Sequence, residues 1–455
     1  MKKFKWLTSV GLAGTLFLAG CGGTNDGNDT ADADNGNNDG NNNTASEELE
    51  EDVSIRMQIV WATDSGRGEA IQRIIEDFEE QNENISVELV GGAQDNQRIL
   101  TQILSGEAPE VMQLAYRQVR SLGAEGAFVD MAADFEDERD NYYEELWNLG
   151  SVGDSLYGFP WLGHTIQLVY NNDMFEEAGI EEPPATWDEL YETAKELTKD
   201  TTGDGEIDQY GLGLVGQQSH DITWMVNMFV HQAGAELVTE DDNGDYKVAL
   251  NTPEGKEALE FYKKLVDEVA PPDTVNKDGG EVMADFRNEL VAMEFQGPWG
   301  VTDIWQNGNP FEVKTAATPE GPAGAASELG PYMLSVPTEL EPEKEAAAKQ
   351  LIEYLGSKEA QEMIMLGEQG EDGEYYPFRV PMRKDLADME YFQENPEFLV
   401  FIEGLENPSI STPVESWLQV EEEIYQSLLN QLVTGNKTAD EVLESLEEEG
   451  NRILE

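Results

Sequence analysis

The sequence predicts an α/β protein of two domains, and three observations support this prediction. Apolar residues alternate over 55–61, fall on one helical face over 71–78 and alternate again over 85–89. This strand–helix–strand order implies a parallel sheet covered by helices. About 400 residues follow the first fifty, which is enough for two domains of ordinary size. Proline and glycine gather at 317–331 and 367–381, as is typical of connections between domains.

The N-terminus predicts export and a lipid anchor. Basic residues 1–5 precede an apolar stretch over 6–19, which is shorter than the roughly 20 residues of a bilayer-spanning helix. The stretch ends in Leu-Ala-Gly-Cys, which resembles a bacterial lipobox. Residues 1–20 are therefore expected to be a lipoprotein signal peptide, with Cys21 as the lipidated first residue of the mature chain. Cys21 is the only cysteine, so the sequence offers no disulfide framework, cysteine metal site or catalytic thiol.

Acidic residues dominate the chain, whose formal net charge is −67. Residues 21–52 are rich in Asn, Asp, Gly and Thr, cannot bury enough apolar area to fold, and are expected to form a flexible acidic tether. The tether holds ten acids, so most of the negative charge belongs to the folded body. Nucleic acid is a poor partner for such a body. We interpret the acidity as adaptation to a salty or an alkaline exterior.

Further elements follow along the body. Residues 111–114 predict another strand, and capping boxes at 186–189 and 438–441 predict helices that begin there. The string at 211–216 fits a dinucleotide-binding fingerprint. Because it follows an acidic loop, a glycine-rich strand is favoured. No internal repeat of solenoid type is present.

Several segments, in order along the body, resemble the motifs of one family. They are 104–111 (LSGEAPEV), 168–190 (with LVYNNDMF and PATWDEL), 295–299 (FQGPW), 357–361 (SKEAQ) and 432–437 (LVTGNK). Together they resemble the sugar-binding extracellular solute-binding proteins, the group that includes the maltose-binding proteins.

Two positions depart from the family pattern. Glu110 stands where the family usually has Asp, and His164 stands where close maltose-binding relatives have an acidic ligand contact. Both departures leave the identity of the sugar open.

The resemblance implies a two-lobe periplasmic-binding-protein fold, type II-like, with hinge crossings and a cleft between the lobes. The first lobe would take residues 53–162 and about 331–375, and the second about 166–325 and 380–455. By this resemblance a sugar, expected to be an oligosaccharide, is captured by lobe closure and delivered to the permease subunits and ATPase of an ABC importer. A monomer that is lipid-anchored on the extracellular face of the cell membrane, and is not an enzyme, is implied as well.

Sugar recognition requires flat aromatic surfaces beside paired hydrogen-bonding groups. By the resemblance, Trp299 is the first candidate for a stacking surface, and Trp417, Trp224 and Trp161 are further candidates. For each of them a position in the core is the structural alternative.

Polar candidates lie where strands are expected to end. Asp64, Ser65 and Arg67 follow the first strand, and Tyr116 and Arg117 follow the strand that ends near residue 114. An arginine fork can hold two neighbouring hydroxyls or the carboxylate of an acidic sugar.

Two more polar candidates are His164, in the expected crossing, and Asp221, just before Thr223 and Trp224. A structural hydrogen bond is the alternative role for each.

An acidic stretch resembles the first nine positions of a calcium loop, with candidate ligands Asp200, Thr202, Asp204, Glu206 and Asp208. Its third position lacks an acid, and its twelfth is glycine in place of a bidentate Glu. The sequence leaves a structural calcium ion and a plain acidic turn both open, and predicts no other cofactor.

Two other functions remain as alternatives: a secreted glycoside-active enzyme with two carboxylates, and a ligand-sensing surface protein. With so many acids in the body, carboxylate pairs arise by chance and carry no argument for the enzyme. The sequence contains no His-Glu-x-x-His, Gly-x-Ser-x-Gly or phosphate loop.

Overall fold

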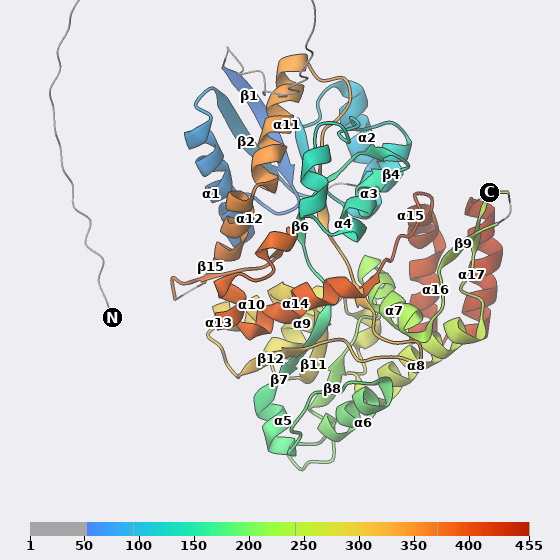
Figure 1. The fold of residues 1–455 in the computed structure, drawn as a ribbon. Helices are drawn as coiled ribbons and strands as arrows, with labels where there is room; N and C mark the ends of the chain where they lie inside the picture. The colour runs from blue at the N-terminus through green and yellow to red at the C-terminus, as the bar shows by residue number, and fades with distance from the viewer. Residues whose placement is uncertain (1–51, 94, 242, 371, 455) are drawn as a thin grey trace, which may run out of the picture. The chain divides into compact units, whose positions relative to one another are not determined.

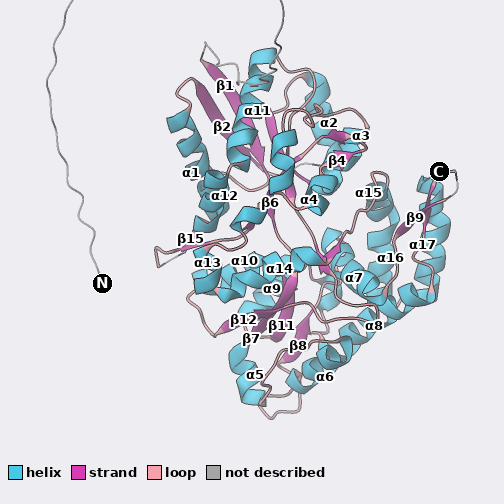
Figure 2. Ribbon diagram, in the orientation of Figure 1, coloured by secondary structure: helices cyan, strands magenta, loops and turns pink. Residues whose placement is uncertain are grey.

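The computed structural model describes residues 52–454 apart from 94, 242 and 371. The expected signal peptide, the lipidated Cys21 and residues 21–51 of the expected tether lie outside the described residues. Figure 1 shows the order of the elements, and Figure 2 shows the strands of the two larger sheets lying among helices.

The first lobe is built on a six-stranded sheet with the order β17-β6-β14-β3-β1-β2. β1 pairs in parallel with β2 and β3, whereas β14 is antiparallel to β3 and β6, and β17 is antiparallel to β6. The strands are β1 (Val53–Ile59), β2 (Ile85–Gly91), β3 (Val111–Ala115), β6 (Phe159–Gly163), β14 (Tyr332–Ser335) and β17 (Val380–Pro381). The strand–helix–strand unit predicted from the hydrophobic pattern is confirmed.

Helices pack on this sheet because their apolar faces match its buried side chains. α1 (Gly66–Gln81) buries Ile71, Ile74 and Phe78 in the same core as the apolar side chains of β1 and β2, and it contacts β2 directly. Ser65 caps α1, since its hydroxyl accepts a hydrogen bond from the Gly68 N–H at 3.1 Å. The other helices of this lobe are α2 (Asn96–Ser105), α3 (Tyr116–Ala124), α4 (Glu144–Leu149), α11 (Pro342–Gly356) and α12 (Lys358–Met363).

The second lobe is built on a four-stranded sheet with the order β12-β7-β11-β8. β11 is antiparallel to β7 and parallel to β8. The strands are β7 (Gln167–Asn171), β8 (Tyr210–Gly213), β11 (Val291–Gln296) and β12 (Val313–Ala316). The glycine-rich string at 211–216 therefore begins in a strand, as predicted. A side chain at Gly211 would meet the Ala194 carbonyl oxygen at 1.9 Å, so the adjacent helix requires glycine there.

Helices cover both faces of the four-stranded sheet. One face carries α9 (Gly279–Arg287), α10 (Pro298–Gln306), α13 (Glu390–Glu394) and α14 (Leu399–Glu403), whose apolar side chains continue into the core of the first lobe. The second core cluster contains the helices of the opposite face: α5 (Asn172–Ala178), α6 (Trp187–Leu197), α7 (His220–Ala233), α8 (Pro253–Val269), α15 (Trp417–Val420), α16 (Gln426–Val433) and α17 (Ala439–Leu454).

Both predicted capping segments lie at helix starts. At α17 the box is complete: the Thr438 hydroxyl accepts from the Glu441 N–H at 3.3 Å, and the Glu441 carboxylate accepts from the Thr438 N–H at 2.9 Å. At α6 Thr186 caps in the same way, but the carboxylate of Glu189 accepts from the Ala185 N–H instead.

The chain passes between the sheets at 163–167, at 316–332 and after β17. β13 (Ser327–Glu328) and β18 (Pro408–Ser409) pair in parallel beside these passages. β17 extends the first-lobe sheet to Pro381, so the return to the second lobe comes slightly later than the expected boundary at about 380.

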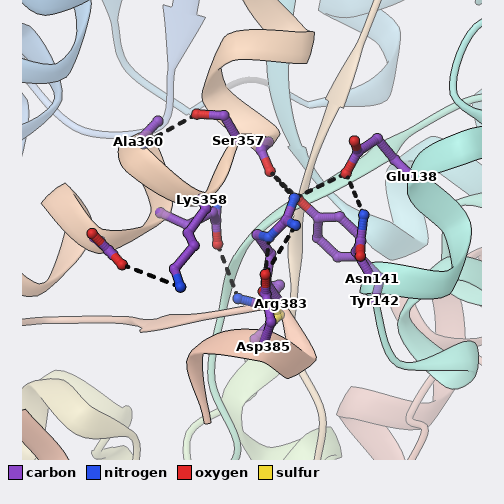
Figure 3. A network of polar contacts seen from close by, with 12 residues as sticks. Glu138, Asn141, Tyr142, Ser357, Lys358, Ala360, Arg383 and Asp385 are labelled. Carbon is purple, nitrogen blue, oxygen red and sulfur yellow. Dashed lines mark hydrogen bonds and ion pairs between the residues drawn. The ribbon is translucent and has the colours of Figure 1, made fainter. Parts of the chain in front are cut away.

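Arg383 fixes the last of these passages to the first lobe (Figure 3). Its side chain is 8% exposed and donates to Glu138 at 2.9 Å, to Asp385 at 3.0 Å and to the Gly356 carbonyl at 3.1 Å. Tyr142 donates to the same carbonyl at 2.8 Å. The guanidinium of Arg383 holds the pKa of Asp385 below its usual range. The buried cation of Arg383 thus has two carboxylate partners, Glu138 and Asp385.

The stability of the fold is expected to depend on pH through His231, which belongs to α7 and lies beside β18. Its Nδ1 lies 2.6 Å from the Ser409 hydroxyl, and burial lowers its pKa to about 4. An unfolded histidine titrates near about 6.5, so the unfolded chain binds the extra proton between these two values and stability falls as the pH falls. Lowering the pH from 7 to 5 should reduce the free energy of unfolding of both proteins. We expect this reduction to be about 1–2 kcal/mol smaller in the His231→Gln variant than in the unsubstituted protein. Urea unfolding at both pH values measures this, and equal losses would contradict it.

Candidate ligand-binding cleft

A cavity of about 670 Å³ lies between the two sheets. Val60 and Trp61 follow β1, Tyr116 and Arg117 follow β3, and Gln296 ends β11, and all of them line it. The carboxyl ends of parallel strands are the usual ligand-binding edge of α/β sheets. Both sheets thus present this edge to one cavity, whose volume suits a small molecule.

Trp299 forms a flat wall of the cavity, as predicted from the Gly-Pro-Trp segment. Its indole N–H donates to the Gln296 amide oxygen at 2.7 Å, which fixes the ring. A side chain at Gly297 would lie 2.2 Å from the Trp299 ring, so only glycine lets the ring fold back over the start of α10. The His164 ring stands edge-on to the indole at 4.6 Å.

Trp224 lines the cavity from the first turns of α7. Its indole N–H donates to Asp221 at 3.1 Å, and the other carboxylate oxygen of Asp221 accepts from the Gly279 N–H at 2.9 Å. Asp221 thus orients one aromatic wall and holds the start of α9.

A polar chain joins the two lobes across the cavity. Arg117 of α3 lies 2.9 Å from His220 Nε2, and His220 Nδ1 lies 2.5 Å from Glu421. Because a guanidinium can only donate, Nε2 accepts and Nδ1 carries the proton toward Glu421. Burial alone would raise the pKa of Glu421, but His220 and Arg117 bring it below its usual range. Glu421 belongs to a π-helical turn, Glu421–Tyr425, a feature common at functional sites.

Two buried acidic groups, Tyr116 and Glu328, also line the cavity. The Tyr116 hydroxyl accepts from the Thr412 N–H at 3.1 Å, and burial raises the pKa of Tyr116. Glu328 accepts from the Ser411 hydroxyl at 2.8 Å, and burial raises its pKa well above the usual range, which favours the neutral acid.

His164 also lines the cavity. Burial, and then the positive charge of Arg379, hold the pKa of His164 well below its usual range, so the imidazole is neutral and offers one donor and one acceptor.

Four sequence candidates lie elsewhere, and the structure corrects them. Trp161 and Trp417 are 0% exposed and belong to the cores of the first and second lobe, because sheet and helix residues enclose them on all sides. Ser65 uses its hydroxyl as the cap of α1, and Asp64 points to solvent outside the cavity wall. Of the three candidates predicted after the first strand, Arg67 alone lines the cavity.

The cavity also contains residues that sequence reasoning missed. They include Val60, Trp61, Asp95, His220, Gln296, Glu328, Tyr332, Arg379 and Glu422. The hydrophobic alternation predicts Trp61 as the last residue of the first strand, but β1 ends at Ile59, so Trp61 follows the strand as the predicted polar candidates do. Nothing in the sequence distinguishes Arg379 from the other arginines.

The acidic loop that resembles a calcium loop satisfies its own carboxylates. Asp200 accepts from the N–H groups of Gly203 and Gly205, each at 2.6 Å, and Asp208 accepts from the Thr201 N–H at 2.8 Å. Within the described part of the chain, no group of three or more His, Cys, Asp or Glu side chains is placed to hold a metal ion.

The two α/β lobes meet at a cavity that is lined by tryptophans and hydrogen-bonding side chains. This arrangement is that of a two-lobe, small-molecule-binding protein with the periplasmic-binding-protein fold. The chain belongs to the family of bacterial extracellular solute-binding proteins, which it matches over residues 61–362. The fold class and family predicted from the motifs are both confirmed.

Individual relatives are distant. A putative binding protein of Brucella abortus is 24% identical over 85% of this chain and 90% of its own. The diacetylchitobiose-binding protein of Streptomyces coelicolor is 27% identical over 65% of each chain. The solute-binding protein of an ABC transporter of Thermotoga lettingae, solved with α-D-tagatose, has a TM-score of 0.75 and 26% identity, covering 88% of this chain and 100% of that one.

Among the described residues, no helix is both long enough and apolar enough to span a bilayer.

Proposed function

We propose that this protein is the sugar-binding component of an ABC-type importer. The observation that carries the proposal is the wall of the cavity: Trp61, Trp224 and Trp299 surround the space together with amide, imidazole and guanidinium groups. The C–H faces of a sugar pack on aromatic rings, and its hydroxyls need donors and acceptors at fixed positions. The saccharide ligands named for two relatives, diacetylchitobiose and tagatose, support the same class of ligand.

Closure of the lobes would couple binding to transport. Arg117 and His220 belong to different lobes, as do Arg120 and Glu415, whose side chains form an ion pair of 3.2 Å. A ligand that touches both lobes favours the arrangement that brings these groups together. In this proposal the permease subunits with their ATPase recognise that arrangement in a monomeric binding protein, and no cofactor is required.

The proposed location is the extracellular face of the cell membrane, with Cys21 carrying the lipid. One acyl-type anchor on a long tether leaves the binding body in water. Labelling with radioactive palmitate, and loss of the label in Cys21→Ser, would test this part.

Binding and turnover are separated by one pair of measurements. The soluble body, residues 53–455, is titrated with a library of mono- and oligosaccharides while its tryptophan fluorescence and melting temperature are followed, and the same mixtures are then examined for cleavage products. We expect saturable binding that raises the melting temperature and leaves the saccharide intact. Cleavage would favour the glycoside-active enzyme, and no interaction with any saccharide would overturn the proposal.

A further inference from the structure

Arg379 is a buried cation on the wall of the cleft. It directly precedes β17, is 4% exposed and lines the cavity. Its guanidinium lies 4.3 Å from the ring centre of Trp299, 5.4 Å from that of Trp61 and 5.5 Å from that of Tyr332. The cation is therefore held against the aromatic surfaces on which a sugar ring would stack.

No carboxylate neutralises Arg379 within the described residues. One Nη donates to the carbonyl of its neighbour Phe378 at 2.7 Å, and the buried Nε has no hydrogen-bond partner. Burial lowers the pKa of Arg379 to about 9 and the charge of Arg67 adds to the shift, whereas the Tyr332 side chain, which hydrogen-bonds to the guanidinium, and the charge of Glu368 act in the opposite direction. A buried charge without an ion-pair partner is costly, and a ligand carboxylate placed beside it would lower that cost.

Arg383, four residues further along, shows the contrast. It is buried to a similar degree, but Glu138 and Asp385 both pair with it (Figure 3). The same short segment thus holds one arginine with two carboxylates and one with none. The one without carboxylates is the one that lines the cavity.

The acids around the cavity are already engaged. Asp221 accepts from Trp224 and from the Gly279 N–H, and Asp95 accepts from the Arg98 N–H at 2.8 Å. Burial raises the pKa of both Glu328 and Glu422, which weakens their negative charge. Three arginines face the same space, although the protein as a whole carries a net charge of −67.

We propose that the ligand of the cleft carries a carboxylate, as a uronate-containing saccharide does, and that Arg379 binds this carboxylate while Trp299 stacks on a sugar ring. This proposal rests on the proposed function. A planar guanidinium matches a carboxylate with two parallel hydrogen bonds, and the pair would satisfy the free N–H and neutralise the charge at once. A neutral hydroxyl could accept the hydrogen bond but would leave the charge uncompensated.

The test compares acidic saccharides with their neutral parents. Di- to tetrasaccharides of galacturonate, glucuronate and mannuronate are titrated by calorimetry beside the corresponding oligomers of galactose, glucose and mannose. We expect at least one uronate series to bind about 10-fold or more tightly than its neutral parent. Arg379→Met should then weaken uronate binding by about 10- to 100-fold and remove most of the preference for the uronate over its neutral parent.

Two variants serve as controls. Arg379→Lys keeps the charge without the planar fork, and its affinity for the uronate should lie between those of the unsubstituted protein and Arg379→Met. Arg452→Gln removes one positive charge from an exposed site on α17, far along the chain from the cavity residues, and should leave the affinity unchanged.

The outcomes separate the two proposals. If neutral saccharides bind and no uronate binds more tightly, the carboxylate proposal is overturned and the sugar-binding function stands. If no saccharide of any kind binds, the proposed function itself fails. If Arg379→Met cannot be purified in folded form, the comparison of the acidic and neutral series on the unsubstituted protein still decides.

Discussion

Trp299→Ala is expected to weaken saccharide binding by about 3 kcal/mol, which is roughly a hundredfold or more in Kd. The reason is geometric. Gln296 and the close approach at Gly297 fix the indole as a wall of the cavity, so that the ring needs little further ordering when a ligand binds. Alanine removes that surface and leaves water where the C–H groups of the sugar would pack.

The matched control for Trp299→Ala is Trp305→Ala. Both tryptophans belong to α10, but Trp305 packs against Tyr376 and Phe398, away from the cleft. Calorimetry with a saccharide found in the library should show a large loss for Trp299→Ala and less than about a threefold change for Trp305→Ala. Equal affinities in the two variants would remove Trp299 from the site. Circular dichroism of each variant verifies that the comparison is made on folded protein.

Trp161→Ala is expected to lower the free energy of unfolding by about 3–5 kcal/mol, the cost of truncating a large buried aromatic side chain. Trp161 lies in β6, within the core of the first lobe, and has no exposed surface. Its indole N–H has no hydrogen-bond partner among the described residues, so Trp161→Phe loses volume but no hydrogen bond. We expect the phenylalanine variant to recover more than half of the loss.

Urea unfolding followed by circular dichroism measures both Trp161 variants, and saccharide binding is measured on each below the unfolding transition. If Trp161 is a core residue, Trp161→Ala should lower the urea concentration at the unfolding midpoint strongly. The folded fraction of this variant should still bind saccharide with the affinity of the unsubstituted protein. If Trp161→Ala unfolded at the same urea concentration as the unsubstituted protein but no longer bound saccharide, Trp161 would be a ligand contact after all.

Local patterns were sufficient for the architecture. The alternation in β1 and β2 and the apolar face of α1 depend on residues close together in the sequence, and the same holds for the capping box at Thr438 and Glu441. The motif at Gly297 and Trp299 could also be read locally, because the glycine and the ring touch each other.

The choice among the tryptophans could not be made locally. Trp161 ends in a core and Trp61 ends on the cavity wall, although each belongs to, or directly follows, a strand of the same sheet. Burial is the sum of contacts from segments far apart in the chain, and Trp61 follows the end of its strand where the sheet edge faces the cleft. Asp64 and Ser65 were misassigned for a related reason, since a helix N-terminus can use its polar side chains for capping instead of for a ligand.

The sequence by itself determined the alternation of strands and helices and the family, and it indicated Trp299 as the first candidate for an aromatic wall. The tertiary structure alone decided which polar groups face one another. Arg379 and Arg383 are four residues apart and chemically identical, yet Glu138 meets one and aromatic rings meet the other. Electrostatic partners are selected by distances of a few ångströms between segments that the chain brings together only on folding, and no local pattern records those distances.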